Sequence, residues 1–376
     1  MTVRFEEFEG VGSKLYQLNW LLPVLAGLLG LVGVMAILSA NNGVWQHGAM
    51  QHSVRITFAF MVMIGVALTN IRVWYSLAYP AYFAALLLLV GVEFFGINVN
   101  GSVRWLQLGP IRIQPSEVIK PAVVLALARF YHDLPSWRVS DPIGLAGVLF
   151  LIGAPMALVL RQPDLGTSLL ICATGAAIIF LAGVSWRVIT LGSVLVAISV
   201  PIVWQFGLRD YQRGRILTFL DPSRDPAGAS YHITQSKIAL GSGGVSGKGY
   251  MQGSQRQGGY VPENSTDFIS TVIGEEFGFI GSLALMGLYI AVIAACIRLS
   301  MQCKAVFSRL LILGLTTTFA LYIFINLGMV MGLLPVVGVP LPLVSYGGTV
   351  ILVVMGSFGL MLSAHLHTGT PLPRSD

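Results

Sequence analysis

The stretch 142-PIGLAGVLFLIGAPMALVL-160, 161-RQPD-164, 165-LGTSLLICATGAAIIFLAG-183 decides the class of fold. It consists of two apolar runs joined by a short polar segment. A helix of about 20 residues crosses the roughly 30 Å of hydrocarbon in a bilayer. An open strand would leave its backbone groups without hydrogen bonds in lipid, so both runs must be helices. The stretch therefore predicts two transmembrane helices joined by a tight turn.

Similar apolar runs fill most of the chain. Of the 376 residues, 55% are apolar and 10% are charged, and the mean hydropathy is +0.79. Soluble domains carry about 25% charged residues. The sequence predicts an all-α integral membrane protein, a single polytopic domain over residues 1–376, while residues 367–376 are expected to be disordered. About ten spans are expected, at 18–39, 54–70, 75–96, 115–131, 142–160, 165–183, 187–206, 269–297, 306–331 and 343–364.

The basic residues of the short loops predict the orientation. With the N-terminus inside, ten arginines and lysines fall on the cytoplasmic side, against only Arg104, Arg112 and Arg161 in the short outer loops. This bias predicts a multi-pass protein of the cytoplasmic (inner) membrane with both termini in the cytoplasm. The net charge of +6 reflects these orientation signals, and it is no indication of a nucleic-acid partner.

One loop, at about 207–268, lies between the seventh and eighth helices and is too long to be a simple connection. On the predicted topology it is extracytoplasmic. Long loops cross the membrane regardless of charge, so its excess of basic residues, among them Arg213, Arg215 and Lys248, needs another cause. An anionic ligand at the outer surface is the simplest cause.

Polar residues also gather at the start of the fourth predicted helix. Arg104-Trp105 and Arg112 precede it, and Pro115-Ser116-Glu117 suits its first turn. Lys120 lies three residues after Glu117, on the same helix face. A charged pair at membrane depth is costly, so we expect it to face a polar cavity where Arg112 and Lys120 bind phosphate. The structural alternative is a capped helix with a local ion pair.

The run Gly241-Ser242-Gly243-Gly244-Val245-Ser246-Gly247-Lys248-Gly249 suggests a phosphate-binding loop but does not form one. A Walker A motif requires Gly six residues before the Lys, where Ser242 stands, and Ser or Thr after it, where Gly249 stands. A flexible loop whose backbone approaches a ligand closely stays possible.

Two acidic residues precede the eighth helix. Asp267 lies at its start, and Glu263 lies one turn earlier. Asp267 is either a helix N-cap, a common role for aspartate, or a partly desolvated general base. Glu263 would be a second carboxylate or a metal ligand. Further along, the proline-rich residues 334–342 predict a non-helical outer loop packed against protein.

In this order, these blocks resemble the SEDS family (shape, elongation, division and sporulation) of bacterial envelope glycosyltransferases, from Trp20 to His367. Residues 231–237, 247–249 and 334–346 resemble the members that act in elongation and rod shape more than those that act in division. The resemblance is carried by Arg104-Trp105-Leu106, Gln114-Pro115-Ser116-Glu117 with Lys120, Asp221-Pro222, Gln235-Ser236, Gly241-Ser242-Gly243-Gly244, Pro262-Glu263, Thr266-Asp267-Phe268-Ile269, Glu275-Glu276 and Ser345-Tyr346-Gly347-Gly348.

The resemblance implies an inverting peptidoglycan polymerase that joins lipid II disaccharide units by β-1,4 bonds and releases undecaprenyl diphosphate. The family's essential aspartate falls on Asp267, and its important Trp, Arg and Lys fall on Trp105, Arg112 and Lys120. Many relatives carry a glutamate eight residues before that aspartate, where this chain has Gly259. The implied partners are a class B penicillin-binding protein and other membrane proteins of the elongation complex.

Several alternatives stay open from the sequence. A divalent cation, Mg²⁺ or Mn²⁺, could assist departure of the diphosphate, but no residues show a ligand pattern. A lipid-precursor flippase would use charges such as Glu93, Glu117 and Lys120 along a transport path. A scaffold would only hold a class B penicillin-binding protein. The concentration of charges in and beside one outer loop favours the enzyme.

Overall fold

The structure is a computed structural model that describes residues 10–99, 102–109, 111–221, 223, 229–258 and 265–373. Glu263 and Gly259 lie outside the described residues. Helices dominate, and short strands occur in one place. The helices are α1 (Val11–Gln17), α2 (Leu21–Ala40), α3 (Met50–Leu68), α4 (Ile71–Phe95), α5 (Pro115–Asp133), α6 (Pro142–Arg161), α7 (Leu165–Leu181), α8 (Trp186–Ile202), α9 (Asp210–Leu220), α10 (Ala229–Ser242), α11 (Ser254–Gln257), α12 (Ile269–Gln302), α13 (Val306–Val330) and α14 (Gly348–Leu366).

All ten predicted spans fall on helices. In the described part of the chain, eight helices are long and apolar enough to cross a bilayer, and α7 is a shorter apolar helix. The remaining span falls on α5, whose Glu117, Lys120, Arg129 and Asp133 lower its hydropathy. The second span begins earlier than predicted, because π-helix η1 (Trp45–Ala49) leads directly into α3.

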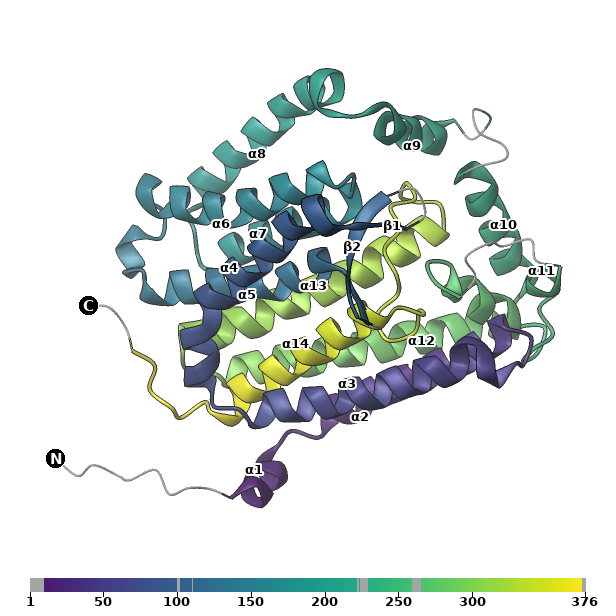
Figure 1. Ribbon diagram of the computed structural model, residues 1–376, viewed down its shortest axis with the longest axis horizontal. Coiled ribbons are helices and arrows are strands. Elements are labelled where there is room, and N and C mark those ends of the chain that lie inside the picture. The colour runs from purple at the N-terminus through teal and green to yellow at the C-terminus, as the bar shows by residue number, and fades with distance from the viewer. Residues whose placement is uncertain are drawn as a thin grey trace.

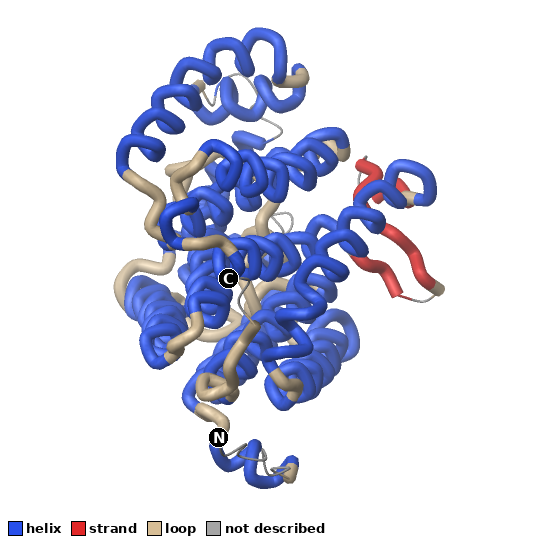
Figure 2. Tube along the Cα trace, turned by 90° about the vertical axis from the view of Figure 1, so that its left-hand side faces the viewer, coloured by secondary structure: helices blue, strands red, loops and turns tan. Residues whose placement is uncertain are grey.

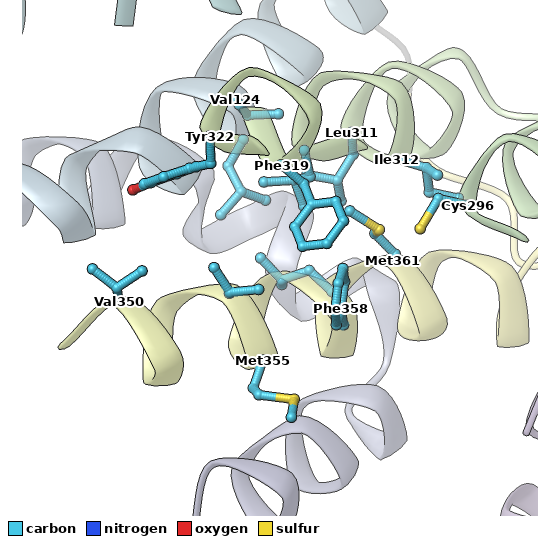
Figure 3. Packing of buried hydrophobic residues seen from close by; sticks show 14 of the residues in the cluster. Val124, Cys296, Leu311, Ile312, Phe319, Tyr322, Val350, Met355, Phe358 and Met361 are labelled. Carbon is cyan, nitrogen blue, oxygen red and sulfur yellow. The ribbon is translucent and has the colours of Figure 1, made fainter. Parts of the chain in front are cut away.

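The centre of the bundle is built by α5, α13 and α14. In the most apolar part of α14, 67% of the residues are buried, and in that of α13, 61% are buried. In that of α8, no residue is buried. Phe319 of α13 and Phe358 of α14 meet edge to face, with ring centroids 5.2 Å apart (Figure 3). In Figure 1, α8, π-helix η3 (Val203–Gly207) and α9 run along the top of the molecule.

Residues 97–113 depart from the all-α prediction. They form a small antiparallel sheet of β1 (Ile97–Val99), β2 (Ser102–Leu108) and β3 (Ile111–Ile113), which lies beside the helices in Figure 2. Trp105 pairs with Ile97, and Leu106 pairs with Ile113. The strands satisfy each other's backbone groups in the segment between α4 and α5.

The C-terminal residues also differ from expectation, because Pro371 and Pro373 contact the bundle, while residues 374–376 lie outside the described residues. The Tyr75 hydroxyl donates to the carbonyl of Pro373 (3.1 Å), and the Arg72 guanidinium donates to that of Pro371 (3.3 Å). The 3₁₀-helix η2 (Ser136–Arg138) follows the same end of α5. The C-terminal residues lie towards the left of Figure 1, whereas β1, β2, α10 and α11 lie towards the right.

Candidate active site

A cavity of about 690 Å³ opens at the end of the bundle where α5, α7 and α12 begin. Its walls come from parts of the chain that are far apart in sequence. They combine charged, aromatic and glycine residues. The lining residues are Arg104, Trp105, Gln114, Glu117, Lys120, Pro163, Asp164, Thr167, Arg209, Arg215, Thr266, Asp267, Tyr322, Gly338, Val339, Pro340, Tyr346, Gly347 and Val350.

A buried ion pair forms the inner wall. Pro115 is the first residue of α5, and Glu117 lies in its first turn. Lys120 follows one turn after Glu117, and its ammonium lies 2.7 Å from the Glu117 carboxylate, as the spacing predicted. The Tyr322 hydroxyl of α13 donates to Glu117 and accepts from Lys120, whose nitrogen lies 4.4 Å above the tyrosine ring. Both charged residues are at most 3% exposed. Three mutual partners therefore compensate the cost of burying these charges.

Asp267 lies in the turn just before α12, on the cavity wall. Three successive carbonyl groups of that turn accept hydrogen bonds from α13 and the segment after it. They are those of Ser265 (from Tyr346 N, 2.9 Å), Thr266 (from Ser345 Oγ, 2.6 Å) and Asp267 (from Asn326 Nδ2, 2.8 Å). These bonds fix the backbone that carries the carboxylate, which is the preorganisation that a general base requires.

The proline-rich loop supplies a second constraint on Asp267. Asn326 also donates to the carbonyl of Val339 (2.8 Å), so one amide joins this loop to the Asp267 turn. Gly338 has a left-handed φ of +71°, and a Cβ there would lie 3.5 Å from Oδ2 of Asp267. Gly338 was not predicted to be a site residue. Its position among Pro335, Pro340 and Pro342 was the available signal.

Two arginines, Arg209 and Arg215, also line the cavity. Arg215 of α9 donates to the carbonyl of Val336 (3.3 Å), and Arg209 lies just before α9. Arg209 was not among the predicted substrate-binding residues. Arg213 was, but it does not line the cavity, because its guanidinium donates to the carbonyl of Gln205 (2.7 Å).

The remaining charges of the wall hold the sheet in place. The Arg104 guanidinium donates to the carbonyl of Gln162 (3.1 Å) and lies 3.8 Å from the Asp164 carboxylate. Asp164 in turn caps α7 through the backbone N–H and the hydroxyl of Thr167. These contacts join β2 to the turn between α6 and α7, and they place the neighbouring Trp105 at the cavity wall.

The charges around the cavity are therefore of two kinds. Arg104 and Lys120 are each paired with a carboxylate of the same wall. Arg209 and Arg215 make no ion pair with any described residue. Such a cavity has cations available for an anionic ligand and, in Asp267, a carboxylate beside them.

Comparison with known proteins identifies the family. The family of FtsW, RodA and SpoVE, described as "Cell cycle protein", matches residues 16–370. The chain belongs to this family. It is the SEDS family that the motifs resemble.

Individual relatives in the family are named as peptidoglycan glycosyltransferases. The chain is 45% identical over 321 residues to the peptidoglycan glycosyltransferase MrdB of Escherichia coli K12, covering 85% of this chain and 86% of that one. It is 34% identical over 358 residues to a probable peptidoglycan glycosyltransferase FtsW of Trichlorobacter lovleyi, covering 93% and 92%.

Two solved structures of the family have the same fold. One is a peptidoglycan synthase complex that coordinates polymerization and crosslinking, with a TM-score of 0.82, 30% identity, and coverage of 94% of this chain and 99% of that one. The other is the rod-shape-determining protein RodA of Thermus thermophilus, with a TM-score of 0.70, 27% identity, and coverage of 93% and 96%.

Three further residues that were predicted to bind substrate do not line the cavity or lie outside the described residues. Arg112 is exposed on β3, and its carbonyl accepts from Thr349. Lys248 forms an ion pair with Glu275 (2.7 Å) and does not line the cavity. Glu263 lies outside the described residues.

Metal ligands for this SEDS protein are not evident in the described part of the chain. No three residues among its histidines, cysteines, aspartates and glutamates come together there in a way that could hold a metal ion. The question of a divalent cation at the diphosphate therefore stays as the sequence left it.

Proposed function

We propose that this chain polymerises lipid II in an inverting reaction, with Asp267 as the general base. The observation that carries the proposal is that Asp267, Arg209 and Arg215 line one cavity together with Trp105 and the Glu117–Lys120 pair. Membership of the SEDS family, and the names of relatives such as E. coli MrdB, support a peptidoglycan glycosyltransferase.

Asp267 and the two arginines have separate roles in the proposed reaction. The 4-hydroxyl of the acceptor's GlcNAc attacks C1 of the donor's MurNAc, and its proton passes to the Asp267 carboxylate. The bond from C1 to the diphosphate oxygen breaks at the same time, which converts an α linkage into a β linkage without a covalent enzyme intermediate. The negative charge on the departing undecaprenyl diphosphate is stabilised by Arg209 and Arg215.

The part of the cavity lined by Trp105 and the Glu117–Lys120 pair binds the sugars. Trp105 stacks on a sugar ring, because aromatic faces suit the apolar face of a pyranose. The buried pair of Glu117 and Lys120, held by Tyr322, presents both an acceptor and a donor of hydrogen bonds at a fixed position. Arg112, Arg213 and Lys248, which do not line the cavity, contribute to binding only if the outer segments move towards it.

The proposal includes orientation and partners. The cavity opens on the outer face, both termini are cytoplasmic, and the protein resides in the bacterial inner membrane. The bias of basic residues towards the opposite end of the bundle supports this orientation. A class B penicillin-binding protein is the proposed partner, supported by the similar structure of a complex that coordinates polymerization and crosslinking. The reaction serves cell elongation and rod shape.

The direct test is a gel assay of lipid II polymerisation by purified protein, with and without the penicillin-binding partner. We expect Asp267→Asn to abolish glycan synthesis. Asp141→Asn is the matched control, because Asp141 also lies just before the start of a helix but does not line the cavity. Glycan synthesis at the wild-type rate by Asp267→Asn would disprove the general-base role.

The two rival functions make different predictions. A flippase would move labelled lipid II across proteoliposome membranes without forming glycan. A scaffold would lose activity only through changes in the partner's transpeptidase site. The charged lining of the cavity comes from one end of the bundle, which favours a surface reaction over a path through the membrane.

A further inference from the structure

Helix α12 is interrupted at its tenth residue, and a loop from before the helix supplies the missing hydrogen bonds. Gly278 has φ 65° and ψ −156°, which is not helical. In a continuous helix, the next two N–H groups would donate four residues back. Instead, Phe279 donates to the carbonyl of Gly244 (2.9 Å), and Ile280 donates to that of Val245 (3.1 Å).

The carbonyl groups left over by this break are also satisfied by the same loop. The carbonyl of Glu275 accepts from the backbone N–H of Lys248 (3.1 Å), and that of Glu276 accepts from Gly249 (3.0 Å). Residues 244–249 therefore replace one turn of helical hydrogen bonds. The sequence suggested that the backbone of the glycine-rich run could approach a ligand closely, and in the structure it approaches α12.

Glycine is required at this junction for steric reasons. A Cβ on Gly247 would lie 2.1 Å from the carbonyl oxygen of Glu276, and Gly247 has a left-handed φ of +81°. A Cβ on Gly243 would lie 2.1 Å from the carbonyl oxygen of Gly274. By contrast, a Cβ on Gly241, in the same run, would meet no atom within 4 Å.

The side chain of Glu275 fastens the loop from within. Glu275 is 1% exposed, and its Oε1 accepts from the Lys248 ammonium (2.7 Å), the backbone N–H of Gln255 (2.9 Å) and the Ser254 hydroxyl (3.3 Å). A buried carboxylate with three donors from the outer loop is a strong attachment, because charge-assisted hydrogen bonds are about twice as strong as neutral ones.

This attachment fixes the first part of α12, which follows Asp267 and Phe268 directly. Residues 269–277 lie between Asp267 and the break, so the loop determines how they are oriented relative to the rest of the helix. The loop also continues directly from α10, whose Ala239 packs with Phe268, the neighbour of Asp267. Displacement of the loop would release this short segment at the break and remove the packing of α10 against Phe268, although the Asp267 carbonyl would keep its bond from Asn326.

We propose that Glu275, Lys248 and residues 243–249 form an anchor that positions Asp267, so that Lys248 is a positioning residue and not a ligand of the diphosphate. This inference rests on the proposed role of Asp267 as base. Misplacing a catalytic group by about 1 Å can cost about 100-fold in rate. The anchor therefore controls kcat and leaves the binding of lipid II to the cavity residues.

The first test compares Gly247→Ala with the control Gly241→Ala in lipid II polymerisation by the full chain. We expect Gly247→Ala to lower kcat by about 100-fold and to change KM for lipid II by less than about twofold. Hydrogen exchange of the amides of residues 279 and 280 should become faster, while Gly241→Ala matches the wild type. Faster exchange with wild-type kcat would overturn the proposal.

The second test uses Lys248, in case Gly247→Ala does not fold. We expect Lys248→Met to lower kcat by about tenfold at unchanged KM, and Lys248→Arg to restore it. A raised KM with wild-type kcat in Lys248→Met would make Lys248 a substrate ligand and overturn the proposal. Wild-type kinetics in Lys248→Met, with Asp267→Asn inactive, would overturn the anchor alone. Activity in Asp267→Asn would instead overturn the proposed function.

Discussion

The two ends of α5 carry the same kind of ion pair in different surroundings. At its first turn, Glu117 and Lys120 lie 2.7 Å apart, and their side chains are 5% and 2% exposed. At its last turn, Arg129 and Asp133 lie 3.6 Å apart, with side chains 23% and 27% exposed. The first pair faces a cavity, and the second lies at the opposite end of the bundle.

The partners of the two pairs differ as well. The Arg129 guanidinium lies over the rings of Tyr75 and Tyr79, 4.6 and 4.7 Å from their centroids. The Tyr75 hydroxyl donates to Asp133 and to the carbonyl of Pro373. The chain's own C-terminal residues therefore complete that cluster. At the other end, the chain leaves room for a ligand, which distinguishes a candidate site from a structural contact.

The largest effect is expected from breaking the cavity pair on one side. Glu117→Gln leaves the buried Lys120 ammonium without its counter-charge, which costs about 3–5 kcal/mol of folding free energy. We expect loss of lipid II polymerisation and a lower midpoint of thermal unfolding in detergent. Wild-type stability and activity together would contradict the role of this pair.

Replacing both members separates stability from function. Glu117→Met with Lys120→Met removes both charges, and such replacements are often neutral for stability. We expect the double variant to unfold at about the wild-type temperature but to make no glycan. If it polymerises lipid II normally, the pair is not part of the site.

A smaller effect is expected at Gly338, which does not contact the pair. Gly338→Ala strains a left-handed backbone by about 1–2 kcal/mol and places a methyl group near the Asp267 carboxylate. We expect a reduced kcat with KM unchanged. Gly356→Ala is the control, because a Cβ at that helical position meets nothing within 4 Å. Equal kcat in the two variants would exclude Gly338 from the site.

The smallest effect is expected at the other end of α5. Asp133→Asn removes a partly exposed ion pair worth about 1 kcal/mol or less. We expect a slightly lower midpoint of thermal unfolding and unchanged lipid II polymerisation. A loss of activity as large as that of Glu117→Gln would remove the distinction between the two ends.

Local patterns predicted the features that depend on neighbouring residues. The ten spans follow from the lengths of the apolar runs, and the contact of Glu117 with Lys120 follows from helical spacing. Tyr322 could not be predicted as their partner, because it lies 205 residues from Glu117 and only helix packing brings it there.

The contacts of the outer segments were also hard to predict, because they too depend on residues that are far apart in the sequence. Whether Arg209 or Arg213 faces the cavity depends on the direction of α9, which no local pattern determines. The strands at 97–113 are too short to give a clear alternation. Lys248 was assigned to a ligand because its buried partner Glu275 is 27 residues away, within what looked like an apolar span.

The most direct test of the account is to map where lipid II binds. Purified protein would be cross-linked to a lipid II probe with a photoreactive group on its sugar, and the labelled peptides would be identified by mass spectrometry. We expect labelling of peptides that contain Trp105, Arg215 or Tyr346, and we expect unlabelled lipid II to suppress it. Specific labelling confined to the Tyr75–Asp133 end of the bundle would contradict it.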